Sequence, residues 1–156
     1  MTSDRFDIVI AEDDDGHATL LRRNLRRAGF ASEPVRVRDG QEALDYLYRR
    51  GPWHGRPRHA ELVLLLDLNM PRLGGLEVLR QLKADDERTR IPVFVLTTTD
   101  DPVEVDRCYQ LGAAACIVKP VDPDSFSEAV QRLARFLMTT RLPGEAPSPP
   151  PRSHGH

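Results

Sequence analysis

Four short apolar stretches of the sequence run directly into polar residues that could take part in chemistry. Glu12 and Asp13 follow the stretch FDIVIA, Asp67 follows LVLLL, Thr97 follows PVFVL and Lys119 follows ACIV. An ionised carboxylate is costly to bury unless it is paired or bound to a metal. A single Asp at the end of a strand usually caps the next turn, so Asp67 gains a chemical role only if the other four residues surround it.

The apolar stretches have the length of strands, and segments with helical periodicity separate them. Five consecutive apolar residues before Asp67 indicate a strand buried on both faces, as at the centre of a parallel sheet. The expected strands are 6–11, 33–37, 62–66, 92–96 and 115–118, and the expected helices are 16–28, 40–50, a segment that begins at 74–75, 102–111 and a segment that begins after 122–123. This alternation predicts a three-layer, doubly wound (βα)5 α/β sandwich with a five-stranded parallel sheet.

The order of the strands decides whether the polar residues meet. With the order 2-1-3-4-5 of flavodoxin-like folds, the first and third strands flank the point where the topology switches, and the fourth and fifth lie beside them. Three carboxylates, one hydroxyl and one ammonium would then share one crevice. Three acids without a cation would raise one another's pKa, and a bound Mg2+ would relieve this. Such a pocket suits a phosphoryl group, which a carboxylate attacks while the metal and the ammonium neutralise its oxygens.

Length and composition exclude several classes of protein. A chain of 156 residues with 40% hydrophobic and 29% charged residues fits one globular domain. The formal net charge of -2 argues against a nucleic-acid partner, and no apolar run approaches the length of a membrane span. Cys108 and Cys116 lack metal or redox spacing, so we expect reduced thiols and a cytoplasmic location. We expect one domain over 1–140, followed by a flexible, proline-rich tail over 141–156.

Taken in order, these motifs make the chain similar to the receiver domains of two-component response regulators, over residues 6–138. The resemblance rests on Glu12-Asp13, Asp67 within LLDLNMP, Gly75, Thr97 after PVFVL and Lys119-Pro120. It implies that Asp67 is the phosphoacceptor and receives a phosphoryl group from a sensor histidine kinase. A receiver catalyses its own phosphorylation and dephosphorylation, so the resemblance implies a switch rather than an enzyme with a separate substrate.

The resemblance also implies roles for the surrounding residues. Glu12 and Asp13 would hold Mg2+ together with Asp67 and the backbone carbonyl of Asn69. Lys119 would bind a phosphoryl oxygen, with a cis peptide bond to the proline that follows it. Thr97 would swing its hydroxyl onto the phosphoryl group and report its presence to the surface.

Longer phrases are similar to one subgroup, the stand-alone response regulators that partner bacterial phytochromes. The phrases are VRDGQEALDYL, LLDLNMPRLGGLEVL, IPVFVLTTTDD and CIVKPVD. This similarity implies a phytochrome-type kinase and a homodimer formed through the last two helices and the fifth strand. The length leaves no DNA-binding domain after residue 140, which fits a single-domain regulator.

The sequence departs from the family three positions before the lysine, where Cys116 replaces the usual aromatic residue. A cysteine is small and cannot act as a large rotating reporter. We therefore hypothesise that phosphorylation is read through the loop 97–101 or through dimerisation.

Two other functions compete with the phosphorylation switch. One is a receiver-like interaction module that works without phosphate, although the intact acid pair, Asp67 and Lys119 argue against it. The other is a phosphatase with an aspartyl nucleophile, which needs a second Asp two residues after the first to act as an acid. That position is Asn69, which cannot transfer the proton in this way. The five histidines share no ligand spacing and are expected to be surface groups: His17, His54, His59, His154 and His156.

Overall fold

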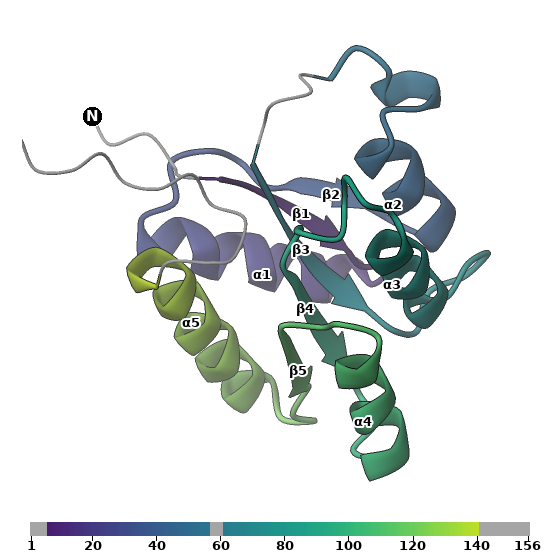
Figure 1. The fold of residues 1–156 in the computed structure, drawn as a ribbon. Coiled ribbons are helices and arrows are strands. Elements are labelled where there is room, and N and C mark those ends of the chain that lie inside the picture. Colours follow the sequence, from purple (N-terminus) through teal and green to yellow (C-terminus); the bar gives the residue numbers. More distant parts are fainter. Residues whose placement is uncertain (1–5, 57–60, 141–156) are drawn as a thin grey trace, which may run out of the picture.

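The structure is a computed structural model that describes residues 6–56 and 61–140 (Figure 1). Its strands are β1 (Asp7–Ala11), β2 (Val35–Val37), β3 (Leu62–Asp67), β4 (Val93–Thr97) and β5 (Ala115–Val118). Its helices are α1 (Asp15–Ala28), α2 (Gly40–Leu47), the short 3-10 helix η1 (Gly51–Trp53), α3 (Gly75–Ala84), α4 (Pro102–Gln110) and α5 (Pro123–Thr139). The tail expected over 141–156 lies outside the described residues.

All neighbouring strands pair in parallel, in the order β2-β1-β3-β4-β5. The predicted fold class and strand order are therefore confirmed. One helix is shorter than predicted: α2 ends at Leu47 instead of continuing to residue 50. Arg49 has a positive φ of 56° and Gly51 one of 57°, so the chain leaves the helical conformation there.

The sheet is covered on both faces, which is why β3 can be apolar along its length. Leu62, Leu64 and Leu66 pack with α2 and α3, whereas Val63 and Leu65 pack with α1 and α5. Figure 1 shows α1 and α5 together on one side of the sheet and α2, α3 and α4 on the other. All six residues of β3 are buried, as the sequence predicts for the central strand.

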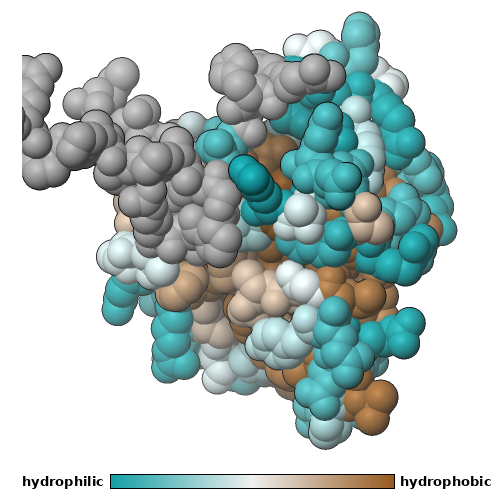
Figure 2. Space-filling model, in the orientation of Figure 1, coloured by the Kyte–Doolittle hydropathy of each residue, from teal (hydrophilic) through white to brown (hydrophobic). Residues whose placement is uncertain are grey.

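Several large hydrophobic side chains are also exposed. The exposed set comprises Val103, Tyr109, Val118, Val121, Phe136 and Met138, which belong to α4, β5, α5 and the β5–α5 connection. In Figure 2 hydrophobic colouring extends over the lower half of the face, where β5 and α4 lie in Figure 1. Within the described residues, no helix has both the length and the apolar character needed to cross a membrane.

Candidate functional site

The ends of β1 and β3 bring three carboxylates together. Ala11 pairs with Leu66 in the sheet, so the acids that follow β1 lie level with Asp67 at the end of β3. Carboxylate oxygens of Glu12, Asp13 and Asp67 all lie within 4.8 Å of one another. Asp13 is exposed, whereas Glu12 and Asp67 are only 1% and 5% exposed. This cluster is open to solvent on one side and has two buried ligands on the other.

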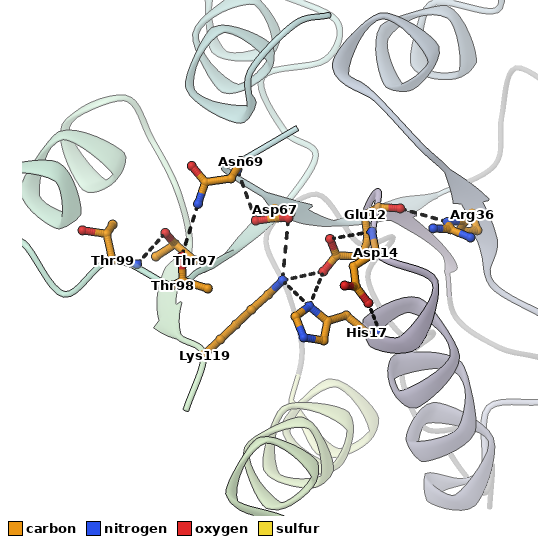
Figure 3. A network of polar contacts seen from close by, with 10 residues as sticks. All are labelled: Glu12, Asp14, His17, Arg36, Asp67, Asn69, Thr97, Thr98, Thr99 and Lys119. Carbon is orange, nitrogen blue, oxygen red and sulfur yellow. Dashed lines mark hydrogen bonds and ion pairs between the residues drawn. The ribbon is translucent and has the colours of Figure 1, made fainter. Parts of the chain in front are cut away.

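Lys119 brings the cation of the site from the end of β5. Its backbone N–H donates to the Thr97 carbonyl oxygen at 2.6 Å, which ties the chain after β5 to the end of β4. Its Nζ atom lies 2.5 Å from Glu12 Oε1 and 3.7 Å from Asp67 Oδ2. Figure 3 shows the ammonium between these two carboxylates. The lysine side chain is 3% exposed, so this ion pair is buried. In this arrangement the ammonium is bound mainly to Glu12 and only more distantly to Asp67.

The charges of the crevice shift the pKa values of its two buried acids in opposite directions. Burial, reinforced by the neighbouring Glu12 carboxylate, raises the pKa of Asp67 to about 7. Burial also works to raise the pKa of Glu12, but hydrogen bonds with Asp67 and Lys119 outweigh it and lower that pKa. Asp67 therefore holds its proton up to near neutral pH, because burial and the Glu12 carboxylate raise its pKa more than the Lys119 ammonium lowers it. A hard divalent cation with oxygen ligands fits this donor set and would supply the missing positive charge.

Asn69 and Thr97 line the opposite side of Asp67. The backbone N–H of Asn69 donates to Asp67 Oδ1 at 3.2 Å, and its side-chain amide donates to Thr98 Oγ1 at 3.3 Å. Thr97 is fully buried at the end of β4, and its Oγ1 accepts from the Thr99 N–H at 3.1 Å. In this arrangement the Thr97 hydroxyl holds the loop after β4 (Figure 3).

Two residues at the site were not found by sequence reasoning. His17, expected to be a surface group, places its Nδ1 atom 3.1 Å from Lys119 Nζ and 3.4 Å from Glu12 Oε1. Arg36 of β2 donates from Nε to the Glu12 carbonyl at 2.9 Å and from Nη1 to Asp15 at 2.7 Å. The available signal for His17 is its position four residues after Asp13, in the first turn of the helix that follows β1. The arginine gave no such signal because it is one of many in the sequence.

A further expectation is wrong. The described residues contain no cis peptide bond, so the bond between Lys119 and Pro120 is trans. Trans is the lower-energy isomer of a bond before proline. Lys119 reaches Glu12 and Asp67 with this isomer.

Comparison with known proteins identifies the family. The chain matches the response regulator receiver domain over residues 8–131. It belongs to the receiver-domain family. Receiver domains of this family are phosphorylatable response regulators of two-component systems, bind a divalent metal and interact with histidine kinases. The resemblance inferred from the motifs is therefore confirmed.

Two curated proteins illustrate how much of this receiver is shared. It is 35% identical over 145 residues to the probable methanogenesis regulatory protein FilR2 of Methanothrix harundinacea, covering 92% of this chain and 91% of that one. It is 32% identical over 137 residues to the response regulator Rcp1 of Synechocystis, covering 87% and 92%. These relatives are matched over nearly their full lengths.

Solved structures give the same result for the fold. A receiver domain from Rhodospirillum rubrum is 41% identical with a TM-score of 0.80, covering 89% of this receiver and 98% of that chain. The Mn2+-bound form of Rcp1 is 31% identical with a TM-score of 0.83, covering 89% and 99%. The bacteriophytochrome response regulator AtBRR is 39% identical with a TM-score of 0.67, covering 90% and 98%. The receiver is thus similar to regulators of bacterial phytochromes, and a divalent metal bound to one relative agrees with the acidic cluster found here.

Proposed function

We propose that this receiver accepts a phosphoryl group on Asp67 from a sensor histidine kinase in a Mg2+-dependent reaction. The observation that carries the proposal is the placement of Asp67 within 4.8 Å of two further carboxylates and 3.7 Å from the Lys119 ammonium. Phosphorylation would then switch the binding of partners or the oligomeric state. The cytoplasmic location expected from the sequence stays a prediction.

We assign each residue a role in the transfer from its position in the crevice. Asp67 is the nucleophile: an oxygen of its ionised carboxylate bonds to phosphorus while the bond from phosphorus to the leaving group of the donor breaks. Glu12 and Asp13 would hold Mg2+ together with Asp67 and the carbonyl of Asn69, and a metal bound there would supply positive charge for the phosphoryl oxygens. Because Asp67 has a pKa of about 7 without metal, a bound cation also favours its nucleophilic form.

Lys119 would change partners during the reaction. In the structure the Lys119 ammonium donates to Glu12 Oε1 at 2.5 Å. With Glu12 engaged as a metal ligand, the ammonium would be available to neutralise a phosphoryl oxygen on Asp67, the other acid that it faces. A buried lysine with this exchange of partners would stabilise the charge that develops on the transferred group.

Thr97 and the loop after it would carry the signal outward. The Thr97 hydroxyl now accepts from the Thr99 N–H, and its move toward a phosphoryl group would break that bond and rearrange the loop 97–101. Cys116 has no ring to rotate, and its backbone N–H donates to Tyr109 Oη of α4 at 3.1 Å. Structures with and without a phosphoryl mimic would test this proposal. A change centred on Cys116, with the loop unchanged, would refute it.

The proposal includes a kinase of the bacteriophytochrome type and a homodimer. The phrases shared with phytochrome regulators, and the match to AtBRR, support a bacteriophytochrome as the kinase. A homodimer through α4, β5 and α5 would cover the exposed hydrophobic side chains of that face, of which Val121 is fully exposed. Light scattering of the wild type and of Val121→Asp tests the dimer, which we expect the substitution to weaken. We also propose residues 1–140 as the receiver domain, and the tail predicted from the sequence over 141–156 lies outside the described residues.

Direct detection of the acyl phosphate tests the function. The protein is incubated with acetyl phosphate and Mg2+, and the modified residue is identified by mass spectrometry, with Asp67→Asn alongside. We expect one phosphoryl group on Asp67, with acetate as the leaving group, and none in the variant or without metal. Absence of modification in excess donor and metal would overturn the proposal and favour a phosphate-independent interaction module.

A further inference from the structure

His17 lies against the one lysine of the site, although it belongs to a different element from every other proposed site residue. It stands in the first turn of α1, where its backbone N–H donates to the N-cap residue Asp14 at 2.9 Å. Its Nδ1 atom lies 3.1 Å from Lys119 Nζ, and Figure 3 shows the ring directed at the ammonium. The helix start therefore delivers an imidazole nitrogen to the edge of the crevice.

The chemistry of the two groups fixes the direction of this hydrogen bond. An ammonium has three donors and no acceptor, so Nδ1 accepts from Lys119. Lys119 Nζ has three partners in the crevice, namely Glu12 at 2.5 Å, His17 at 3.1 Å and Asp67 at 3.7 Å. Two of these partners are carboxylates with proposed roles in the reaction, Glu12 as a metal ligand and Asp67 as the nucleophile. His17 is the third partner.

Phe126 of α5 holds the imidazole in place. The centroids of the two rings are 5.1 Å apart with an angle of 32° between their planes. The phenyl ring is 5% exposed, and Lys119 Nζ lies 5.9 Å from its centroid. The His17 side chain is 40% exposed, and the packing of α1 on α5 places its ring against Phe126 on the side that faces the ammonium.

We propose that His17 is a positioning residue that keeps the Lys119 ammonium at the phosphoryl site when Glu12 leaves it for the metal. A neutral acceptor can hold the ammonium without competing with the phosphoryl oxygens for its charge. Without His17, the ammonium would lose the one hydrogen-bond acceptor that it has, among the described residues, besides the proposed metal ligands and the nucleophile. This inference rests on the proposed function, because it concerns how Lys119 reaches the group on Asp67.

The test compares two replacements of His17 in the full chain. His17→Leu removes the acceptor, whereas His17→Asn places an amide oxygen near the position of Nδ1. The rate constant for phosphorylation by acetyl phosphate is measured at saturating Mg2+ by intact-protein mass spectrometry, and the Kd for Mg2+ is measured separately. His54→Leu serves as the matched control, because His54 is an exposed histidine in the turn after α2, with its ring against the Gly51 carbonyl.

We expect His17→Leu to lower the rate constant about fivefold, the effect that loss of one hydrogen bond corresponds to. His17→Asn should recover most of this loss, and His54→Leu should match the wild type. The Kd for Mg2+ should stay within about twofold if His17 acts through Lys119 at 3.1 Å and not through its longer contact, 3.4 Å, with Glu12.

Three results would overturn the inference while the wild type is still phosphorylated on Asp67. They are an unchanged rate in His17→Leu, a Kd for Mg2+ that His17→Leu raises well beyond twofold, and a loss of rate that a folded His17→Asn does not recover. The melting temperatures of all variants separate a folding defect from a defect in transfer. Failure of the wild type itself to be phosphorylated would refute the proposed function instead, so the two failures are distinguishable.

Discussion

The Lys119 ammonium lies 2.5 Å from Glu12 and 3.7 Å from Asp67, so the resting lysine is paired with a proposed metal ligand and not with the proposed phosphoacceptor. Lys119 and Glu12 are 107 positions apart in the chain, and both are buried. The pair gives the metal-free site an internal cation. It also means that Glu12, in its proposed role as a metal ligand, would share its carboxylate between the lysine and the metal or give up the lysine.

Removal of this internal cation should destabilise the protein. Lys119→Met leaves Glu12 buried without its partner, and loss of one member of a buried ion pair costs about 3–5 kcal/mol. Urea unfolding at pH 8 without metal measures the loss in the free energy of unfolding. Mg2+ should restore part of it, since a metal can take over the charge of Glu12. Equal stability of the variant and the wild type would show that the pair has no net effect.

The raised pKa of Asp67 predicts that the metal-free protein loses stability as the pH rises. The unfolded chain releases this proton near pH 3.8, whereas the folded chain keeps it to about 7. Between these values the unfolded state binds fewer protons, so the free energy of unfolding falls with pH, by on the order of 1–4 kcal/mol in total. The lowered pKa of Glu12 acts in the opposite sense, but only below its usual value of 4.5.

Urea unfolding in EDTA at pH 5 and pH 8 measures this effect. Asp67→Asn cannot ionise, so its stability should change much less over the same interval. Mg2+ should stabilise the wild type at pH 8 because it favours the ionised carboxylate. A wild-type protein as stable at pH 8 as at pH 5 would contradict the prediction.

Neighbouring acids after β1 should differ in their effect on metal binding. Asp13 belongs to the carboxylate cluster, so Asp13→Asn should raise the Kd for Mg2+ by about tenfold or more. Asp14 instead caps α1 through the N–H of His17, and an Asn can make the same cap. Asp14→Asn removes the same charge and is the control, with an expected change below about threefold. Calorimetric titration with Mg2+ checks both, and equal losses would mean that only the net charge matters.

The two glycines at the start of α3, Gly74 and Gly75, should differ in how well they tolerate replacement by alanine. A Cβ atom at Gly75 would lie 2.5 Å from the Asp67 carbonyl oxygen and 2.8 Å from Leu68 Cα, because α3 begins against the end of β3. Gly75→Ala should therefore cost about 1–3 kcal/mol and slow phosphorylation by displacing Asp67.

Gly74→Ala is the matched control for this prediction. A Cβ atom there would lie 3.7 Å from its nearest neighbour, the Leu68 carbonyl oxygen, and the residue has an ordinary φ of -72°. We expect a change below about 0.5 kcal/mol. Thermal unfolding and the phosphorylation rate check both variants, and a fully active, stable Gly75→Ala would refute the close approach.

The sequence alone determined the fold class, the strand order and the residues at the strand ends. Apolar runs bounded by glycine, proline and Asp caps mark strands and helices locally, and the rules for parallel sheets then bring the strand ends to one edge. Asp67, Glu12 and Lys119 were therefore predictable as neighbours. The expected length of α2 was wrong because the positive φ angles at Arg49 and Gly51 are not visible in the helical periodicity.

Only the tertiary structure decided which neighbours are bonded. The preference of Lys119 for Glu12 over Asp67 depends on differences of about an ångström between the ends of three strands. The place of His17 depends on how α1 packs on α5, where Phe126 holds the imidazole ring. Local sequence patterns fix which elements form, but contacts between residues more than 100 positions apart are set by the packing of those elements in three dimensions.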